Sequence, residues 1–384
     1  MPPINVDDYR TLARRRLPRM VFDYLDGGAD RERGLAHNRK AFDAFQLVPH
    51  RLADVSTRDQ TVNLFGRTLP TPLVLAPTGL NGALWPDGDV ILARAAAEAG
   101  IPFALSTASN CTLEEVAERA GGDLWFQLYV LGRSLAEALT KRALAAGYKT
   151  LVLTVDVPIN GKRERDMRNG FAIPFRYSPR AVIDGALHPA WLMGQLRHGL
   201  PQLANFAVRG ADDVNAQAAL MKRQMDASYA WDDLKALRDS WPHTLIVKGL
   251  LRPEEAVRCV EFGVDAVVIS NHGARQIEDA PSPLDVLPDF VRSVDCPILV
   301  DSGFRRGSDV VKALALGARC VLIGRPTLYG LAARGGPGVA DVLRMLRTEI
   351  DTTLALIGCS RARDLGPDFI RRTDAVPRPP TAPV

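Results

Sequence analysis

The chain has 384 residues, of which 47% are hydrophobic and 24% charged, and its formal net charge is +4. This balance is typical of a soluble globular protein, and the length suffices for one large α/β domain or two ordinary ones. The small net charge, without a basic stripe carrying interleaved aromatic residues, argues against a nucleic-acid-binding protein.

The five cysteines are scattered and lack a Cys-x-x-Cys pair. They predict reduced thiols in a cytoplasmic protein, with neither a disulfide framework nor a metal site. The first 16 residues contain no apolar signal region, and no run approaches the 18 apolar residues of a membrane-spanning helix.

The N-terminal 70 residues or so predict a helical cap. Apolar residues recur at helical spacing over residues 6–25, and Pro18 should interrupt the helix there. Short extended pieces around Asp59 and Gly66 predict a small hairpin within residues 45–72.

Eight short apolar runs then follow one another, most of them separated by helical patterns. The runs are LVLAP (73–77), PFALS (102–106), LWFQLY (124–129), TLVLTVD (150–156), TLIVKG (244–249), AVVISN (266–271), PILVDS (297–302) and CVLIGR (320–325). Eight alternating units predict a (β/α)₈ TIM barrel over about residues 71–360, within one domain spanning residues 1–384. No G-x-G-x-x-G opens a helix, which argues against a Rossmann domain. A long insertion, about residues 171–212, follows the fourth strand.

Polar residues concentrate at the carboxyl ends of these runs, where α/β barrels place their chemistry. They are Thr78, Gly79, Ser106, Gln127, Tyr129, Thr154, Asp156, Lys248, His272, Arg275, Asp301, Arg305, Gly324 and Arg325. His272 is a candidate base, and Arg275 can hold a carboxylate. The glycine-rich, basic segments 301–309 and 324–326 predict a phosphate site. With Lys248 at a buried strand end, these features leave both pyridoxal phosphate and FMN open.

Seven motifs in the same order resemble the FMN-dependent (S)-2-hydroxy-acid dehydrogenases and oxidases. They are YLDGGA (24–29), QLY (127–129), TVDVP (154–158), VKG (247–249), SNHGARQ (270–276), DSGFRRGSD (301–309) and GRPTLYG (324–330). The resemblance covers nearly the whole chain and decides in favour of FMN. It implies FMN held by Thr78, Gly79, Ser106, Gln127, Thr154, Lys248, Ser270, Asp301, Gly303, Arg305, Gly324 and Arg325.

The resemblance also implies the catalytic roles. Arg163 and Arg275, helped by Tyr24, would clamp the substrate carboxylate, and Tyr129 would bond its hydroxyl. His272 would be the base, with Asp156 orienting it and stabilising the imidazolium. His272 takes either the α-proton or the hydroxyl proton, and the sequence does not decide between the two. This complete set argues against a non-redox FMN barrel and against a non-catalytic flavin protein.

One departure from the family pattern is Ala274, where a second glycine is usual. Its methyl group is tolerable if φ is negative there, and it could narrow the site near Arg275. Small residues at Gly79 and Ala108 should border the substrate side chain and favour an aryl acid such as (S)-mandelate, oxidised to benzoylformate. Other stretches are most like the bacterial (S)-mandelate dehydrogenases of this family. Alternatively, Trp191 or Met193 refills the space.

The insertion mixes apolar residues with arginines and contains one acid, Asp184. This composition predicts peripheral contact with the cytoplasmic side of the inner membrane, or alternatively a lid that packs on a barrel of a cytoplasmic protein. Part of the insertion also resembles bacterial lactate dehydrogenases, which keeps L-lactate open as substrate. The family implies a quinone or another respiratory acceptor, O₂ in an oxidase alternative, and a homotetramer.

Overall fold

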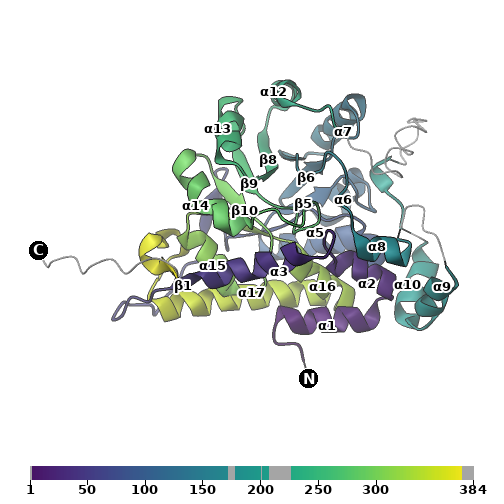
Figure 1. Cartoon of the computed structure of the whole chain (residues 1–384), viewed down its shortest axis with the longest axis horizontal. Helices are drawn as coiled ribbons and strands as arrows, with labels where there is room; N and C mark the ends of the chain where they lie inside the picture. The colour runs from purple at the N-terminus through teal and green to yellow at the C-terminus, as the bar shows by residue number, and fades with distance from the viewer. Residues whose placement is uncertain (1, 172–177, 200, 207–225, 374–384) are drawn as a thin grey trace, which may run out of the picture.

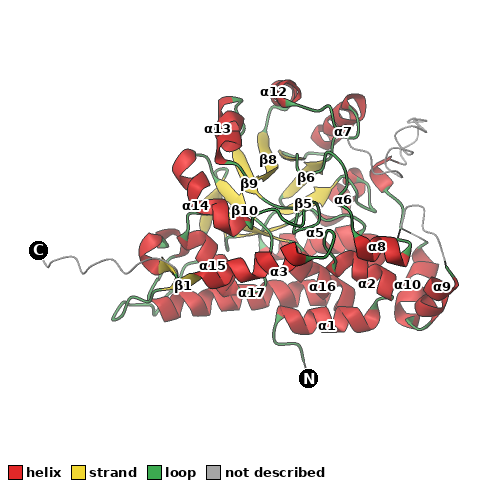
Figure 2. Cartoon of the chain, viewed as in Figure 1, coloured by secondary structure: helices red, strands yellow, loops and turns green. Residues whose placement is uncertain are grey.

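The computed structural model describes residues 2–171, 178–199, 201–206 and 226–373. Eight parallel strands close into a barrel in chain order (Figures 1 and 2). They are β4 (Leu73–Leu75), β5 (Phe103–Ser106), β6 (Leu124–Leu128), β7 (Thr150–Thr154), β8 (Thr244–Leu250), β9 (Ala266–Ile269), β10 (Ile298–Val300) and β11 (Cys320–Ile323). Each lies within, or within one residue of, a predicted run, so the predicted TIM barrel is confirmed.

Helices surround this barrel; those before β11 connect successive strands, and α16 and α17 follow the last strand. They are α4 (Asn81–Leu84), α5 (Gly88–Ala99), α6 (Leu113–Ala120), α7 (Arg133–Ala145), α12 (Trp231–Ser240), α13 (Pro253–Glu261), α14 (Pro283–Ser293), α15 (Gly307–Ala315), α16 (Arg325–Arg334) and α17 (Gly336–Ile357). Local sequence sets several starts. At the start of α6, the Thr112 hydroxyl accepts from the backbone N–H of Glu115, and the Glu115 carboxylate accepts from the backbone N–H of Thr112.

The barrel interior is built by side chains that alternate along each strand. A first inward layer is apolar and includes Trp125 on β6, Val152 on β7 and Ile246 on β8. Two residues further along the same strands, the inward positions are Gln127, Thr154 and Lys248. Since strand side chains repeat with a period of two, the apolar core gives way to a polar mouth within one step.

The N-terminal segment forms the predicted cap and hairpin. Its elements are α1 (Val6–Arg16), α2 (Arg19–Asp26), α3 (Arg33–Lys40), η1 (Ala41–Ala44), β1 (Phe45–Leu47), β2 (Val62–Leu64) and β3 (Arg67–Leu69). Pro18 interrupts the helical pattern, as expected, and is the N-cap residue of α2. The cap packs beside α16 and α17 along the lower side of Figure 1. The β2–β3 hairpin lies under the barrel, where Phe65 meets Trp125 with ring centroids 5.9 Å apart.

The C-terminal part returns to the cap. The short elements η3 (Ala362–Asp364), η4 (Pro367–Phe369) and β12 (Ile370–Arg372) follow α17. β12 pairs antiparallel with β1, so the C-terminal end of the described chain is joined to the last part of the cap in a two-stranded sheet.

The insertion divides into two parts within the described residues. After α8 (Glu164–Asn169), the helices α9 (Pro179–Ala186) and α10 (Pro189–His198) lie at the right end of Figure 1, next to α2. Ile183 on α9, Leu187 between the two helices and Leu196 on α10 are 62%, 74% and 70% exposed. The second part, η2 (Ala204–Phe206), is buried against the barrel. The rest of the predicted insertion, residues 172–177, 200 and 207–212, lies outside the described residues.

Two contacts fix the insertion on the barrel. Trp191 Nε1 donates to Ala83 O at 2.7 Å, and Gln195 Nε2 donates to Gly82 O at 3.0 Å. Within the part of the chain that the structure describes, no helix is long and apolar enough to span a bilayer.

Candidate active site

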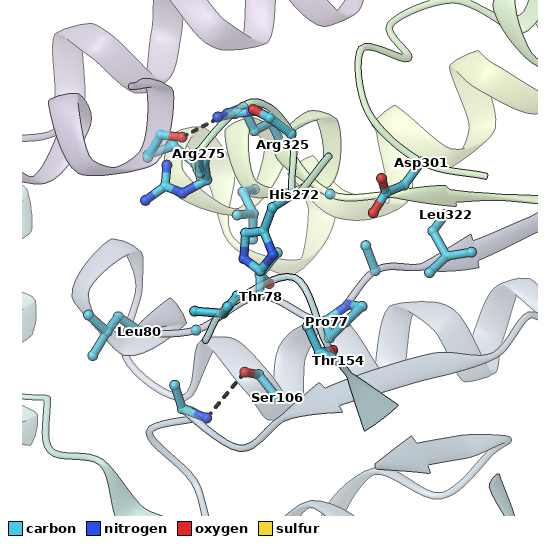
Figure 3. A pocket seen from close by; sticks show the side chains of 18 of the residues that line it. Pro77, Thr78, Leu80, Ser106, Thr154, His272, Arg275, Asp301, Leu322 and Arg325 are labelled. Carbon is cyan, nitrogen blue, oxygen red and sulfur yellow. Dashed lines mark hydrogen bonds between the residues drawn. The ribbon is translucent and has the colours of Figure 1, made fainter. Parts of the chain in front are cut away.

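A cavity opens at the carboxyl ends of the barrel strands, and the predicted site residues converge on it. Figure 3 shows His272, Arg275, Thr78, Ser106, Thr154, Asp301 and Arg325 around this cavity. They lie at the carboxyl ends of six different strands, β4, β5, β7, β9, β10 and β11, or in the segments that follow these strands. Parallel strands end at the same face of the barrel, so residues far apart in sequence meet there.

His272 lies at the centre of a three-residue chain. Its Nδ1 is 2.9 Å from Asp156 Oδ1, and its Nε2 is 3.2 Å from the Tyr129 hydroxyl. An ionised carboxylate only accepts hydrogen bonds, so Nδ1 carries the proton and Nε2 presents a lone pair on the cavity side. This tautomer makes Nε2 the basic atom.

Burial and neighbouring charges shift the pKa values of His272, Asp156 and Tyr129. It lowers the pKa of His272, and the neighbouring Asp156 counteracts this only in part, so the imidazole is neutral near pH 7. Burial alone would raise the pKa of Asp156, but His272 and Lys248 outweigh it and hold that pKa below its usual value. Burial also raises the pKa of Tyr129, which remains a hydroxyl. The site therefore contains a neutral base beside a fixed negative charge.

The histidine sits on a left-handed turn. His272, Gly273 and Ala274 have φ of 58°, 63° and 59°. The negative φ under which an alanine would be tolerated at position 274 is therefore not what the structure shows, and an alanine in this region costs about 1 kcal/mol or more. The cap sustains the turn, because Ala29 N donates to Ala274 O at 2.8 Å.

The methyl group of Ala274 also does not narrow the site. It is buried, and a Cβ added to Gly34 of α3 would lie 2.9 Å from it. Ala274 is absent from the residues that line the cavity, among those the structure describes. The methyl group thus packs on the cap, and Gly34 provides the space for it.

The arginines expected to bind a carboxylate lie on one wall. Arg275 Nη1 donates to Tyr24 O and Gly27 O at 2.8 and 3.0 Å, and the guanidinium lies 5.0 Å from the Tyr24 ring centroid. Arg163 lies beside it, with Nε 3.5 Å from Arg275 O. Tyr24 stacks on Phe171 with centroids 4.4 Å apart. Two cations and a phenol from three segments thus face one part of the cavity.

A second cationic centre is Lys248, which is only 4% exposed. Its Nζ lies 3.1 Å from Asp301 Oδ2 and donates to Ser270 Oγ at 2.9 Å. Ser270 Oγ also accepts from the backbone N–H of His272 at 3.0 Å. Burial would lower the pKa of Lys248, but Asp301 and Asp156 outweigh it, so the pKa is raised and the ammonium stays charged. Ser270 thus connects a buried cation, Lys248, to the backbone of the base, His272.

The predicted phosphate segments lie together after β10 and β11. Gly303, Arg305, Gly324 and Arg325 all line the cavity. The Arg325 side chain donates to Leu25 O, Gly27 O and Gly273 O, and burial lowers its pKa to about 10. Its guanidinium therefore joins the cap to the histidine turn, a role that the sequence did not indicate. Arg305 packs over the Tyr329 ring at 5.7 Å.

The expected substrate side of the cavity has small residues on one wall. A Cβ on Gly79 would lie 3.0 Å from Ala108 Cβ, so only glycine fits that spacing comfortably. Neither Trp191 nor Met193 lines the cavity among the described residues, and Met193 is 47% exposed. The alternative that these two residues refill the space is therefore wrong.

Two apolar residues of the insertion line the cavity instead. Leu203 and Phe206 come from the segment around η2. Asn205 fixes this segment, since its side chain donates to Ser109 Oγ at 3.0 Å and accepts from Leu113 N at 2.9 Å. Sequence reasoning missed these wall residues, because no periodic pattern marks a short 3₁₀ turn inside an insertion.

Two further contacts that hold the loops were also missed. Gln276 Nε2 donates to Asp156 O and Ile159 O at 3.1 and 2.9 Å, which ties the β7 loop to the histidine loop. Asn38 of α3 and Asn271 exchange two amide hydrogen bonds of 2.9 and 2.7 Å. Gln276 lies in the SNHGARQ motif, which offered a signal, whereas nothing in the sequence near Asn38 points to the site.

Comparison with known proteins now identifies the class. The sequence pattern of the FMN-dependent dehydrogenase family matches residues 13–372, and the chain belongs to this family. It is therefore an FMN-dependent oxidoreductase.

Individual relatives narrow the comparison. The chain is 56% identical over 367 residues to (S)-mandelate dehydrogenase of Pseudomonas putida, covering 96% of this chain and 93% of the relative. An L-lactate oxidase of a Nostoc species is 41% identical over 376 residues, covering 96% and 98%. A crystal structure of the monotopic membrane protein (S)-mandelate dehydrogenase superposes with a TM-score of 0.94 at 55% identity, covering 97% and 100%.

The side chains at the mouth fit an FMN cofactor. Among the described residues, Gln127 Nε2 and Thr154 Oγ1 are buried polar atoms without a hydrogen-bond partner. Such atoms cost free energy unless a ligand satisfies them. They lie in the same polar layer as Lys248, whose fixed positive charge suits a ring that becomes anionic on reduction. The glycine-rich loops after the last two strands supply backbone N–H groups for a phosphate.

Proposed function

We propose that the chain oxidises an (S)-2-hydroxy acid to the 2-oxo acid, with (S)-mandelate to benzoylformate as the first candidate reaction. The observation that carries this proposal is the contact of His272 with Asp156 and Tyr129 in a cavity that Arg163 and Arg275 also line. Cap, barrel and insertion all contribute to this cavity, so we propose that residues 1–384 act as one functional domain.

The substrate carboxylate would bind between Arg275, Arg163 and Tyr24. Two guanidinium groups can bind a carboxylate through paired, charge-assisted hydrogen bonds. The carbonyl bonds of Arg275 to Tyr24 and Gly27 hold its guanidinium in place before substrate arrives. Pre-formed geometry of this kind reduces the entropy lost on binding.

His272 Nε2 would take the proton that leaves the substrate. Tyr129, 3.2 Å from this nitrogen, would hydrogen-bond the substrate hydroxyl and bring the reacting carbon within reach of the base. Asp156 would stabilise the imidazolium as it forms. The proton accepted first is either that of the α-carbon or that of the hydroxyl, and both alternatives use the same contacts.

FMN, when bound, accepts the two electrons of the oxidation. We propose that Gln127, Thr154, Thr78, Gly79 and Ser106 contact its ring, and that Lys248, held by Ser270 and Asp301, stabilises the negative charge of the reduced ring. The phosphate would lie near Gly303, Arg305 and the backbone of Gly324 and Arg325. Because Arg325 is bound to three carbonyls, Arg305 would provide most of the side-chain charge.

The substrate side chain would lie against Gly79 and Ala108. Their small volume, with Leu203 and Phe206 on the insertion side, leaves an apolar space that suits a phenyl ring better than a methyl group. The relatives named after L-lactate keep lactate as the second candidate.

We further propose that α9 and α10 contact the cytoplasmic face of the inner membrane and that the electrons pass to a quinone. Exposed Ile183, Leu187 and Leu196 support this, since apolar side chains in water favour an interface. By family analogy the assembly would be a homotetramer. Membrane fractionation of the full chain, compared with a variant that lacks residues 177–210, tests the contact, and a native protein found soluble without detergent would contradict it.

The decisive experiment is an anaerobic visible spectrum of the purified protein before and after adding (S)-mandelate, then L-lactate. We expect a yellow protein that is bleached by mandelate and recovers slowly in air. Bleaching mainly by lactate would retain the reaction and overturn the pocket assignment, and rapid reoxidation in air would indicate an oxidase. A colourless protein that takes up no added FMN would refute the proposal.

A further inference from the structure

Asp89 is a buried carboxylate outside the cavity. It is 0% exposed near the start of α5, and among the described residues no cation forms a salt bridge with it. Its Oδ1 accepts from Asn81 Nδ2 at 2.7 Å, and its Oδ2 accepts from the backbone N–H of Asn110 at 2.8 Å. Burial raises its pKa to about 6, so at pH 7 a charge persists where charge is costly. Both carboxylate oxygens thus accept hydrogen bonds from the segments that follow β4 and β5.

Asn81 connects this carboxylate to Thr78 through hydrogen bonds. Asn81 Nδ2 also donates to Thr78 O at 3.0 Å, and Asn81 Oδ1 accepts from the Thr78 hydroxyl at 3.1 Å. An ionised Asp89 only accepts, so the amide cannot turn over. The proton of the Thr78 hydroxyl is therefore held by Asn81, and the oxygen offers only lone pairs to the cavity that it lines.

A second arm reaches the loop after β5. Asn110 donates to Asp89 through its backbone and accepts from Gly82 N through Oδ1 at 2.8 Å. Leu80 N donates to Ala108 O at 3.0 Å in the same loop. Leu80 has φ 60°, a strained conformation for a leucine that these bonds sustain.

Close packing brings the carboxylate to both loops. A Cβ on Gly88 would lie 2.6 Å from Asn81 O, so glycine allows α5 to begin directly against α4. Neither Asp89 nor Asn81 lines the cavity, among the residues that the structure describes. Asp89 can therefore act on the site only through its neighbours.

We propose that Asp89 is a positioning residue. Through Asn81 it fixes the Thr78 hydroxyl as a hydrogen-bond acceptor facing FMN, and through Asn110 it holds the Gly79 and Ala108 loops at the spacing that borders the substrate. This inference rests on the proposed function, because that function places Thr78, Gly79 and Ala108 beside FMN and substrate.

The test uses Asp89→Asn, Thr78→Val and the double variant. Asparagine keeps the shape of aspartate but has a single accepting oxygen, so it loses the bond either from Asn81 Nδ2 or from Asn110 N. Loss of the first releases Asn81 and the Thr78 hydroxyl, and loss of the second releases the Asn110 loop. We expect each single variant to weaken FMN binding to the apoprotein by roughly tenfold and to shift the flavin absorption and midpoint potential in the same direction. The double variant should be no worse than the worse single one, because the two residues act in one chain.

Asp123→Asn is the matched control. Asp123 is a partly buried aspartate at the opposite end of the barrel, 2.9 Å from Arg67. We expect this variant to leave the FMN affinity, spectrum and potential at their wild-type values. A change equal to that of Asp89→Asn would mean that the flavin properties report general stability, and it would overturn the proposal.

Two other results would also overturn the proposal. One is an Asp89→Asn protein with the wild-type FMN dissociation constant, spectrum and potential, while Thr78→Val alters them. The other is additive effects in the double variant. If Asp89→Asn does not fold, Asn81→Ala removes the link to Thr78, leaves the backbone bonds of Asp89 intact, and is subject to the same comparison. Failure of the proposed function looks different, since the wild-type protein itself would then bind no FMN or resist every 2-hydroxy acid.

Discussion

The two ends of the barrel interior are built by the same strands and have opposite character. At the amino end, Trp125 and Ile246 are at most 1% exposed and pack with the β2–β3 hairpin in an apolar cluster. Two residues further along the same strands, Gln127 and Lys248 face the mouth. One period of the strand thus separates a layer that stabilises the fold from a layer that carries chemistry.

The mouth also holds several strained backbone conformations. Leu80, His272 and Ser302 have φ of 60°, 58° and 76°, and each lines the cavity. Buried polar atoms without partners, such as Gln127 Nε2, lie there as well. Strain and unsatisfied groups lower stability, and they persist where the surrounding structure over-determines them. The apolar packing at the amino end of the barrel therefore offsets the free-energy cost of the strained backbone and unsatisfied groups at the mouth.

The largest expected effect is on the reaction itself. His272→Ala should lower kcat by roughly 10⁴-fold, because the base is lost. The melting temperature and FMN content should remain near wild type, since no core contact changes. Stopped-flow reduction by mandelate measures the rate, and normal bleaching of the flavin in this variant would exclude His272 as the base.

Trp125→Ala should lower the stability of the fold and leave the reaction nearly unchanged. Truncating this buried indole should lower the free energy of unfolding by about 3–5 kcal/mol, measured by urea denaturation. The turnover of the folded, FMN-bound fraction should change little. Gln127→Ala, on the same face of the same strand, is the matched variant, and it should weaken FMN binding at much smaller cost in stability. Equal stability losses in both variants would contradict the division into two layers.

The pH dependence sharpens the electrostatic side of the comparison. Because burial lowers the pKa of His272, kcat/KM should rise with pH and reach a plateau near pH 7, with an apparent pKa below 6.5. The same shift means that the folded state binds fewer protons than the unfolded chain below pH 6.5, so stability falls as pH falls through that window. In Asp156→Asn the apparent pKa should move lower still, because Asp156 raises it. A move upward would show that Asp156 does not stabilise the imidazolium.

The smallest expected effect concerns the strained turn. Ala274→Gly should raise the free energy of unfolding by up to about 1 kcal/mol, since glycine adopts φ near 59° without penalty. Ala340→Gly, at an exposed position of α17, should lower it by a similar amount because φ is helical there. Thermal unfolding measures both, and destabilisation by Ala274→Gly would mean that the methyl packing on Gly34 outweighs the strain.

The sequence by itself determined the barrel. Each run such as AVVIS alternates inward and outward side chains and ends at a polar residue, and this local pattern is enough to place His272, Lys248 and Gln127 at one face. The seven motifs and their order along the chain were also enough to indicate the family, because every motif after YLDGGA lies at the end of a strand or in the segment after it, where the residues that would contact one cofactor meet.

Tertiary structure alone decided how the cap and the insertion complete the site. Nothing local predicts that Arg325 binds carbonyls of the cap, that Phe206 lines the cavity, or that Ala274 takes a positive φ. These features depend on contacts between segments hundreds of residues apart, as between Ala29 and Ala274. Secondary structure follows short-range periodicity, whereas side-chain partners and strained dihedrals follow from which surfaces the closed barrel brings into contact.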